Sequence, residues 1–511
     1  MSDTHAMNTK KDSIHRRRSR SWRLLAPIGI VICLFLAACT ESPQKTTEVS
    51  TVKPSSEKTA VQTTTTPSKQ NVVLIVIDSL RYDHVVGQRN QEPIMPKLQR
   101  FASKSWMYQR ATTQATWTKP AVVSLFTSLY PAVHNTLYGV TVNLGMEQQP
   151  SVDGVPPNIP LMAEYLKEHG YTTIGIQTNA NLNETSGINR GFDEYILKSY
   201  PYGDAHEATD LALDHISVSK TPFFLYLHYM DPHHPYKPPE SYHHIFGEPP
   251  QLSDTDQELI RNFTMGYYLD KVFFQLGLKS SRQFGDISEN GREYLKYMYA
   301  AESRYTDDEM ERLLNWLEKN APETTIIITA DHGEEFWEHG SVGHSKTVYE
   351  ELAHVPLLIR FPGKTPRIIS RDVELIDILP TLAEHLRLPS HEHWQGRSLL
   401  SDPPMTHEPR PIFVETRGSL PTANLFLTAV RLEDYKLIVN RNTGDKTLYY
   451  LGKTGGETTP LSDEEKERQL YELLMKHFED NGKHPLAGST PTRTTLDDTA
   501  IQQLKSIGYL Q

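Results

Sequence analysis

Apolar runs alternate with helix-like stretches from residue 71 onward, and this alternation predicts an α/β fold. The runs lack the regular polar positions of a half-exposed strand, which is typical of strands buried on both faces of a parallel sheet. Alternating strands and helices predict a mainly parallel sheet covered by helices on both faces. The predicted strands are 72–77, 172–177, 223–228, 325–329 and 355–360, and the predicted helices are 95–103, 121–128, 161–169 and 310–320.

Two parts of the chain depart from this alternation. Residues 237–300 contain two Pro-Pro pairs and an aromatic-rich helical stretch, so we expect a helical insertion that forms a lid over a site, with ordinary surface packing as the alternative. Residues 71–402 then form the main domain, closed by a helix at 375–386. The pattern in residues 403–511 predicts a connector that ends at residue 411, followed by a smaller α+β subdomain. Its predicted strands are 412–415, 424–431, 435–440 and 447–450, and its predicted helix is 464–479.

The first 38 residues have the features of a targeting segment. A basic stretch is followed by an apolar run from Leu24 to Leu36, then by small residues before Cys39. The apolar run is shorter than the roughly 20 residues of a spanning helix. The pattern resembles the lipobox of bacterial lipoproteins, in which the cysteine is lipidated after cleavage. An ordinary signal peptide or a short anchor is the alternative.

Residues 39–70 are expected to form a disordered tether between the lipidated cysteine and the folded domain. Fourteen of the 31 residues at 40–70 are serine or threonine, and few are large and apolar. Such a segment buries too little surface to offset its ordering entropy. We therefore expect an extracytoplasmic, membrane-anchored bacterial lipoprotein on the periplasmic or cell-surface side.

The charge balance excludes one class of partner. The full chain has 52 lysine and arginine residues and 63 aspartate and glutamate residues, of which residues 1–38 hold 7 and 2, so the mature chain carries −16. Nucleic-acid binding needs a basic face, so nucleic acid is not expected as a partner. Cys33 and Cys39 are the only cysteines, so the folded domain has no disulfide, thiolate metal site or cysteine nucleophile.

Acidic residues stand at the ends of two predicted buried strands. Asp78 ends the run that begins at Asn71, and Asp331-His332 ends the run that begins at Thr325. Ligands of open α/β sheets bind just beyond the carboxyl ends of the strands. A lone aspartate there is more often a helix cap or a turn former. Two such ends with an adjacent histidine instead favour a divalent cation.

A hydroxyl and several imidazoles could complete such a site. Thr118 precedes Pro120 at the start of a predicted helix, where backbone N–H groups favour an anion, although a helix cap alone explains it equally well. A threonine nucleophile would need activation, for which metal coordination is one route. A histidine-rich segment follows the strand at 223–228, and another pair follows Asp331. The candidates for a second metal or for the leaving group are Asp231, His233, His234 and His344, and Lys346 is a candidate for contact with the anion.

The motifs together resemble the sulfatase family of the alkaline phosphatase-like superfamily. Val76 to Asp83 resembles the opening motif of that family, and Thr118-Lys119-Pro120 with the segment 125–131 resembles its nucleophile segment. Later landmarks are the segments 331–334, 349–351, 355–359, 372–382, 396–399 and 431–437. The resemblance covers nearly everything from residue 71 to the end. It implies an alkaline phosphatase-like α/β fold, with a mainly parallel sheet between helices and a smaller C-terminal α+β subdomain.

Departures from the family pattern shift the expected chemistry. Thr118 stands where the family has the cysteine or serine that becomes formylglycine, and Ala121-Val122 replace the following Ser-Arg. Ser79 replaces the usual second aspartate, which removes a hard oxygen ligand. Zinc or manganese therefore fits better than calcium, the alternative, with one or two ions.

Relatives of the phosphodiesterase and of the phosphoethanolamine or phosphoglycerol transferase kind use a threonine nucleophile. The resemblance therefore implies a hydrolase or transferase that cleaves phosphodiester, phosphonate or related esters through a covalent Thr118 intermediate. It implies metal ligation by Asp78, Thr118, Asp331 and His332, and catalytic roles for His233, His344 and Lys346. A sulfuric ester hydrolase without formylglycine and a non-catalytic ligand-binding lipoprotein are the alternatives. In the first two cases the substrate is an anionic phosphate or sulfate ester.

Overall fold

The computed structural model describes residues 70–141, 151–198, 204–262, 287–400, 409–419, 424–452 and 456–495, with residues 498 and 501. Residues 64–511 form one compact unit. The predicted signal peptide, Cys39, nearly all of the tether, and residues 263–286 of the predicted lid lie outside the described residues. Within the described part of the chain, no helix combines the length and the apolar character that a membrane span requires.

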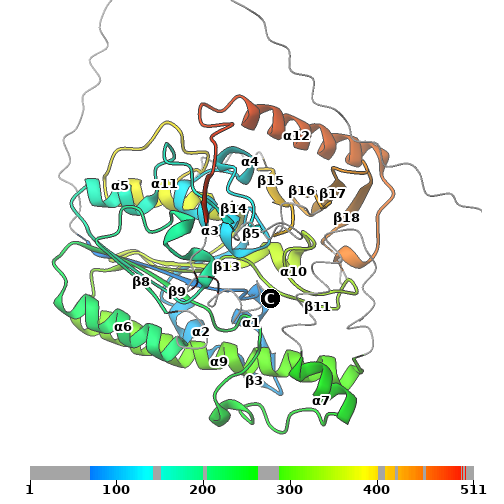
Figure 1. The fold of residues 1–511 in the computed structure, drawn as a ribbon, viewed down its shortest axis with the longest axis horizontal. Coiled ribbons are helices and arrows are strands. Elements are labelled where there is room, and N and C mark those ends of the chain that lie inside the picture. The colour runs from blue at the N-terminus through cyan, green and yellow to red at the C-terminus, as the bar shows by residue number, and fades with distance from the viewer. Residues whose placement is uncertain are drawn as a thin grey trace, which may run out of the picture. The chain divides into compact units, whose positions relative to one another are not determined.

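A large sheet forms the centre of the fold (Figure 1). Its strands are β1 (Val72–Ile77), β4 (Trp106–Thr112), β7 (Thr172–Gln177), β8 (Glu194–Leu197), β9 (Phe223–Tyr229), β10 (Thr325–Ala330), β13 (His354–Arg360) and β14 (Arg367–Glu374). Their order is β14-β4-β13-β10-β1-β9-β7-β8. Strand β13 runs antiparallel to β10 and β4, and the other neighbours pair in parallel. The predicted mainly parallel sheet is therefore confirmed.

Helices cover both faces of this sheet, as the alternating pattern predicts. Helices α3, α5 and α11 lie on one face in Figure 1, and α2, α6 and α9 lie on the other. All ten residues of α3 are buried, because this helix packs between the sheet and its neighbours. The helices are α1 (Tyr82–Val86), α2 (Pro96–Ala102), α3 (Thr118–Thr127), α4 (Pro131–His134), α5 (Met162–Glu168), α6 (Ala205–Val218), α7 (Asp254–Arg261), α9 (Glu289–Asn320), α10 (Glu350–Ala353), α11 (Ile378–His385) and α12 (Glu464–Gly482).

A small antiparallel sheet follows the main domain and confirms the predicted smaller subdomain. It comprises β15 (Ile412–Thr416), β16 (Leu427–Leu432), β17 (Tyr435–Asn440) and β18 (Lys446–Tyr450). Leu470 and Leu474 of α12 pack on Val430, Leu437 and Leu448. The shorter strands are β2 (Gln88–Arg89), β3 (Glu92–Pro93), β5 (Val140–Thr141), β6 (Ser151–Gly154), β11 (Glu335–Phe336), β12 (Val342–Gly343) and β19 (Thr492–Thr495). The 3₁₀ turns are η1 (Ala180–Leu182), η2 (Glu184–Ser186), η3 (Glu240–Tyr242), η5 (Leu375–Asp377) and η6 (Gly456–Thr458).

Three strands of the main sheet are absent from the sequence prediction. Strands β4, β8 and β14 carry polar residues and are only partly buried, so they lack the continuous apolar run that reveals a central strand. Helix α9 begins at Glu289 rather than at 310, and its early turns bury Leu295, Met298 and Tyr299 in the core of the main domain. The expected end of the insertion at residue 300 therefore falls inside a helix of the main domain.

The register of the central strands positions the candidate site. Ile77 at the end of β1 pairs with Ala330 of β10 on one side and with Tyr229 of β9 on the other. The residues that follow these three strands therefore emerge side by side at one edge of the sheet. We call it the carboxyl edge, and the opposite edge the amino edge.

Candidate active site

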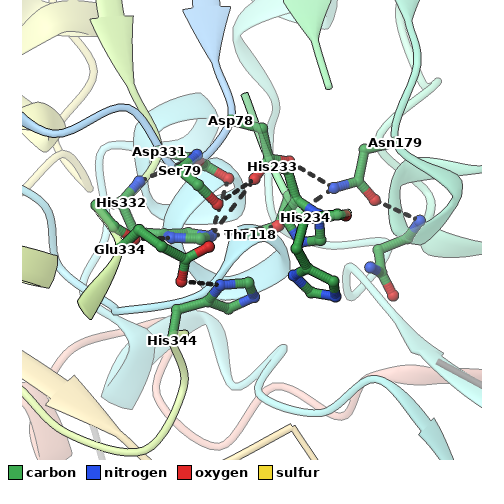
Figure 2. Close-up of polar contacts among 12 residues, drawn as sticks. Asp78, Ser79, Thr118, Asn179, His233, His234, Asp331, His332, Glu334 and His344 are labelled. Carbon is green, nitrogen blue, oxygen red and sulfur yellow. Dashed lines mark hydrogen bonds and ion pairs between the residues drawn. The ribbon is translucent and has the colours of Figure 1, made fainter. Parts of the chain in front are cut away.

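Two buried carboxylates meet at the carboxyl edge, where β1 and β10 end. Asp78 and Asp331 are both fully buried. The backbone N–H groups of Ser79 and His332 donate to Asp331 Oδ1 at 3.1 and 2.8 Å. Ser79 turns through a left-handed conformation with φ of 57°, and its Oγ donates to Asp78 Oδ1 at 3.0 Å. The turn after β1 thus holds both carboxylates (Figure 2).

His332 adds a nitrogen to the same centre. Its Nδ1 donates to the carbonyl oxygen of Gly333 at 2.8 Å, so Nε2 carries the lone pair. That Nε2 lies 3.5 Å from Asp331 Oδ2, 3.7 Å from Asp78 Oδ1 and 3.4 Å from Thr118 Oγ1. Asp331 Oδ2 is buried and accepts no hydrogen bond from the described residues. One nitrogen and three oxygens around an unsatisfied carboxylate atom fit a divalent cation.

The electrostatics of the two carboxylates also favour a cation. Burial raises the pKa of Asp331 well above its ordinary value, and the adjacent Asp78 carboxylate raises it further. Burial acts in the same direction on Asp78, but the imidazoles of His233, His228 and His332 outweigh it and bring the pKa of Asp78 below its usual range. Two like charges this close are stable together only when a positive charge compensates them.

Two residues that the sequence did not single out as site residues contact Asp78. Asn179 Nδ2 donates to Asp78 Oδ2 at 2.6 Å and to Thr118 Oγ1 at 3.3 Å. His228 Nε2 lies 3.1 Å from the same Asp78 oxygen, and its Nδ1 lies 2.7 Å from the hydroxyl of Tyr226. Burial raises the pKa of Tyr226, so its hydroxyl stays protonated and can donate to Nδ1. His228 then donates to Asp78 from Nε2.

Strand pairing explains why these residues reach the site. His228 is the penultimate residue of β9 and pairs with Val76 of β1. Asn179 follows β7, which pairs with β9 on its other side. His228 is the last residue of the predicted strand and adjoins the histidine-rich segment, whereas Asn179 belongs to no motif that signals chemistry. Only the strand order brings its amide to Asp78.

Thr118 is the first residue of α3 and is fully buried. The segment that carries His344 and Lys346 runs beside it. Ser345 N donates to the carbonyl oxygen of Thr116 at 2.9 Å, and Thr116 Oγ1 donates to that of Thr347 at 2.8 Å. The predicted nucleophile and the segment that carries His344 and Lys346 are therefore adjacent in space.

Three of the predicted histidines come together beside the carboxylates. His233, His234 and His344 are buried and each offers a ring nitrogen within 4.8 Å of the others. His344 Nδ1 donates to Glu334 Oε1 at 3.0 Å, and His233 Nδ1 donates to the carbonyl oxygen of His234 at 2.6 Å. The rings of His344 and His332 have centroids 4.4 Å apart, so this group adjoins the carboxylate centre (Figure 2).

The structure places Asp231 and Lys346 differently from the three histidines. Asp231 lies beside Glu302 of α9, and burial and then the nearby Asp204 carboxylate raise the pKa of Asp231 to about 6. The group formed by the three histidines does not include it. Lys346 is buried, and its charge acts on the carboxylate of Glu335, partly offsetting the rise that burial causes in the pKa of Glu335.

Known proteins share this arrangement of elements. A model of the sulfatase family matches residues 70–388. The chain belongs to the sulfatase family. The predicted family and the predicted ester hydrolase class are confirmed, and the enzymes of this family are metal-dependent. Sulfate esterases are not the only relatives of this sulfatase-family protein, as the following comparisons show.

Among curated proteins, the chain is 25% identical over 401 residues to the multifunctional alkaline phosphatase superfamily protein PehA of Trinickia caryophylli, covering 65% of this chain and 77% of PehA. It is 22% identical over 441 residues to "Uncharacterized sulfatase YidJ" of Escherichia coli, covering 73% and 79% of the two chains. Among solved structures, the phosphonate monoester hydrolase of Silicibacter pomeroyi matches with a TM-score of 0.64 and 20% identity, covering 84% of this chain and all of that chain. A 2-O GAG sulfatase matches with a TM-score of 0.63 and 18% identity, covering 81% and 92%. At these identities the structures confirm the fold of the sulfatase-family chain.

Proposed function

We propose that this sulfatase-family protein hydrolyses phosphodiesters or phosphonate monoesters through a covalent intermediate on Thr118. The observation that carries the proposal is the position of the Thr118 hydroxyl. It lies within 3.4 Å of His332 Nε2 and 3.3 Å of Asn179 Nδ2, beside two buried carboxylates. No cysteine or serine occupies this position, so formylglycine chemistry has no precursor there.

The donor set at the carboxyl edge fits a cofactor of the kind expected. Asp78, Asp331, His332 and Thr118 would hold a divalent cation, with zinc or manganese favoured by the imidazole nitrogen. When bound, the cation would lower the pKa of the threonine hydroxyl and neutralise charge on the ester oxygens. Asn179 and Ser79 orient Asp78 for this role, because each donates to a different oxygen of that carboxylate.

The reaction forms one bond to Thr118 and breaks one bond to the leaving group. The Thr118 hydroxyl gives its proton to solvent water as Oγ1 bonds to phosphorus, and the bond between phosphorus and the ester oxygen breaks. His344 or His233 supplies the proton that the departing oxygen needs, since each is held by its Nδ1 with Nε2 directed at the site. Water then attacks phosphorus and the Oγ1–phosphorus bond breaks. The hydroxyl of that water stays on phosphorus, its proton passes to Thr118 Oγ1, and the histidine regains a proton from solvent.

The three histidines could also hold a second cation instead of acting on the leaving oxygen. Each of two rings is oriented by a hydrogen bond from Nδ1, to Glu334 and to a backbone carbonyl, which is how metal-ligating histidines are usually fixed. We propose that His233, His234 and His344 hold either a second cation or the leaving oxygen, with Lys346 contacting the anion. Asp231 is left out because it contacts Glu302 instead.

The substrate class is tested by comparing three leaving-group-matched substrates on the metal-replete protein. An aryl phosphodiester, an aryl phosphonate monoester and an aryl sulfate report the preferred ester. Thr118→Ala is expected to lose a factor on the order of 10³ to 10⁶ in turnover. Thr118→Ser retains a hydroxyl and is the matched control. A preference for the sulfate would favour a sulfuric ester hydrolase, and full activity of Thr118→Ala would remove the nucleophile from the mechanism.

The cellular location belongs to the same proposal. We propose that Cys39 is lipidated and that residues 39–70 tether the folded unit to a bacterial membrane on its extracytoplasmic side. The support is the order of basic stretch, apolar run and small residues before Cys39. Metabolic labelling with a fatty-acid analogue tests it, since Cys39→Ser should abolish the label while the chain is still produced.

A further inference from the structure

The amino edge of the central sheet differs in character from the rest of this acidic protein. The two most exposed large apolar side chains among the described residues are Val218 and Ile368, at 82% and 71% exposure. Val218 ends α6 just before β9 begins, and Ile368 is the second residue of β14. Both strands begin at the amino edge, because β14 runs parallel to β4, and β4 and β10 are each antiparallel to β13.

Basic side chains accompany both apolar positions. Lys220 is exposed two residues after Val218, and Lys364 and Arg367 are exposed just before Ile368. The ammonium group of Lys364 and the guanidinium of Arg367 lie 5.7 and 4.9 Å from the centre of the Trp106 ring, which anchors this loop at the start of β4.

Two carboxylates near this edge, Glu318 and Glu323, lie close to basic groups other than Lys220, Lys364 and Arg367. Glu318 forms an ion pair with Lys104 at 2.9 Å. Glu318 and Glu323 also act on the nearby Arg360 guanidinium. The formal charge of the mature chain is −16, whereas this edge gathers basic groups beside exposed apolar ones.

The chain enters the fold between these two points. Asn71 precedes β1, and its carbonyl oxygen accepts from Thr325 N at 2.9 Å while its Oδ1 accepts from Phe223 N at 3.1 Å. Residue 70 therefore lies at the amino edge between β9 and β10. Five strand steps separate β9 from β14, which corresponds to about 24 Å at the usual strand spacing.

We propose that the amino edge rests on the surface of an anionic membrane, with Val218 and Ile368 as its apolar contact points. Exposed apolar side chains flanked by lysine and arginine are the combination that enters a lipid interface and attracts acidic headgroups. Each strand of the central sheet then stands away from the bilayer. Six residues of β1 separate the two edges, so the catalytic residues lie about 20 Å above the docked edge.

The membrane contact is separable from the lipid anchor and from catalysis. Residues 64–511 form one compact unit that contains neither cysteine, so this unit can be tested without the anchor. We expect it to sediment with vesicles of phosphatidylcholine and phosphatidylglycerol, and not with phosphatidylcholine alone. Lys220→Gln with Lys364→Gln should weaken binding about 25-fold, at roughly fivefold for each basic residue near the surface. Lys476→Gln with Lys483→Gln on α12 removes the same charge and should change binding less than about twofold, since those side chains are 70% and 68% exposed elsewhere.

A single introduced cysteine reports the orientation directly. A polarity-sensitive dye on Ile368→Cys should shift to the blue with anionic vesicles, and the same dye on Leu461→Cys should not. Failure of the unmodified unit to bind anionic vesicles would overturn the proposal, as would equal weakening by the α12 pair. A concentration-dependent dimer that Ile368→Ser abolishes would assign the edge to a second copy of the chain instead.

Discussion

Replacing Asn179 by alanine removes a neutral side chain that contacts both a proposed metal ligand, Asp78, and the proposed nucleophile, Thr118. Its Nδ2 donates to Asp78 Oδ2 at 2.6 Å and to Thr118 Oγ1 at 3.3 Å. Asn179 is itself held by two hydrogen bonds, from its own N–H to Gln177 Oε1 and from Asn181 N to its Oδ1, each at 2.8 Å. The amide is therefore preorganised before substrate or metal arrives.

The magnitude follows from the charge of its partner. A hydrogen bond to a buried carboxylate contributes about 1.5 to 3 kcal/mol, which corresponds to about 10- to 150-fold in an equilibrium constant. Loss of a side chain that orients a metal ligand typically costs about 10- to 100-fold in metal affinity or activity. We therefore expect Asn179→Ala to lower both metal affinity and phosphodiester turnover by about 10- to 100-fold.

Two further variants separate orientation from folding. Asn179→Asp keeps the oxygen that accepts from Asn181 N but loses the donor and adds a negative charge beside Asp78, so its loss should be at least as large. Asn181→Ala removes a buried amide whose side-chain atoms have no hydrogen bond among the described residues, and its activity should stay near that of the parent. Metal content by mass spectrometry and turnover are measured on the same preparations. An Asn179→Ala protein with unchanged metal affinity and turnover would refute the bridging role.

Three other substitutions test the scaffold around the site by urea unfolding. Lys436→Met should cost about 3 to 5 kcal/mol, because this buried ammonium contacts two carboxylates at 2.8 Å, whereas Lys446→Met on the surface should cost less than about 1 kcal/mol; equal costs would contradict the reasoning. Burial lowers the pKa of His339, but the hydrogen bond to Glu351 outweighs burial and raises that pKa above its usual value. The His339–Glu351 pair therefore stabilises the fold fully below about pH 6.5 and loses this contribution as pH rises through the raised pKa. The difference in stability between the parent and His339→Gln should shrink over that pH range, and a constant difference would contradict this reasoning. Gly333→Ala should be strongly destabilising, because a Cβ there would lie 2.0 Å from the carbonyl oxygen of Glu351. Wild-type stability of the variant would show that the two backbone segments can move apart at little cost.

The central strands were predictable because their burial leaves a direct mark on the sequence. Every residue of β1 and β10 is buried, so β1 is an uninterrupted apolar run and β10 contains three consecutive isoleucines between two threonines. Strand β14 begins with exposed residues and carries charge, since it lies at the lateral end of the sheet. Its sequence has no signal that separates it from a loop, and only the pairing with β4 makes it a strand.

The same distinction applies to the site. Asp78, Asp331 and His332 were predictable because they directly follow recognisable strands, and strands of a parallel sheet end together. The positions of Asp231 and Asn179 depend on where a loop turns after its strand, which local sequence does not encode. Asp231 lies beside Glu302 of α9 and not at the carboxylate centre. Asn179, whose side chain is neither acidic nor basic, donates a hydrogen bond to Asp78.

The environment of Thr118 shows why its chemistry is a property of several elements. Ala121 and Val122, which stand where the family pattern has Ser-Arg, are both 1% exposed within a fully buried α3. An arginine side chain there would need a buried counter-charge, which α3 itself does not provide because it contains no acidic residue. The polar partners of Thr118 come instead from the ends of β7 and β10, through Asn179 and His332. A cysteine at position 118 alone would therefore lack the arginine of the formylglycine pattern while keeping an amide and an imidazole placed for a hydroxyl. Thr118, the apolar pair Ala121-Val122 and Asn179 form one consistent set, and that set supports the proposed direct attack by the threonine oxygen.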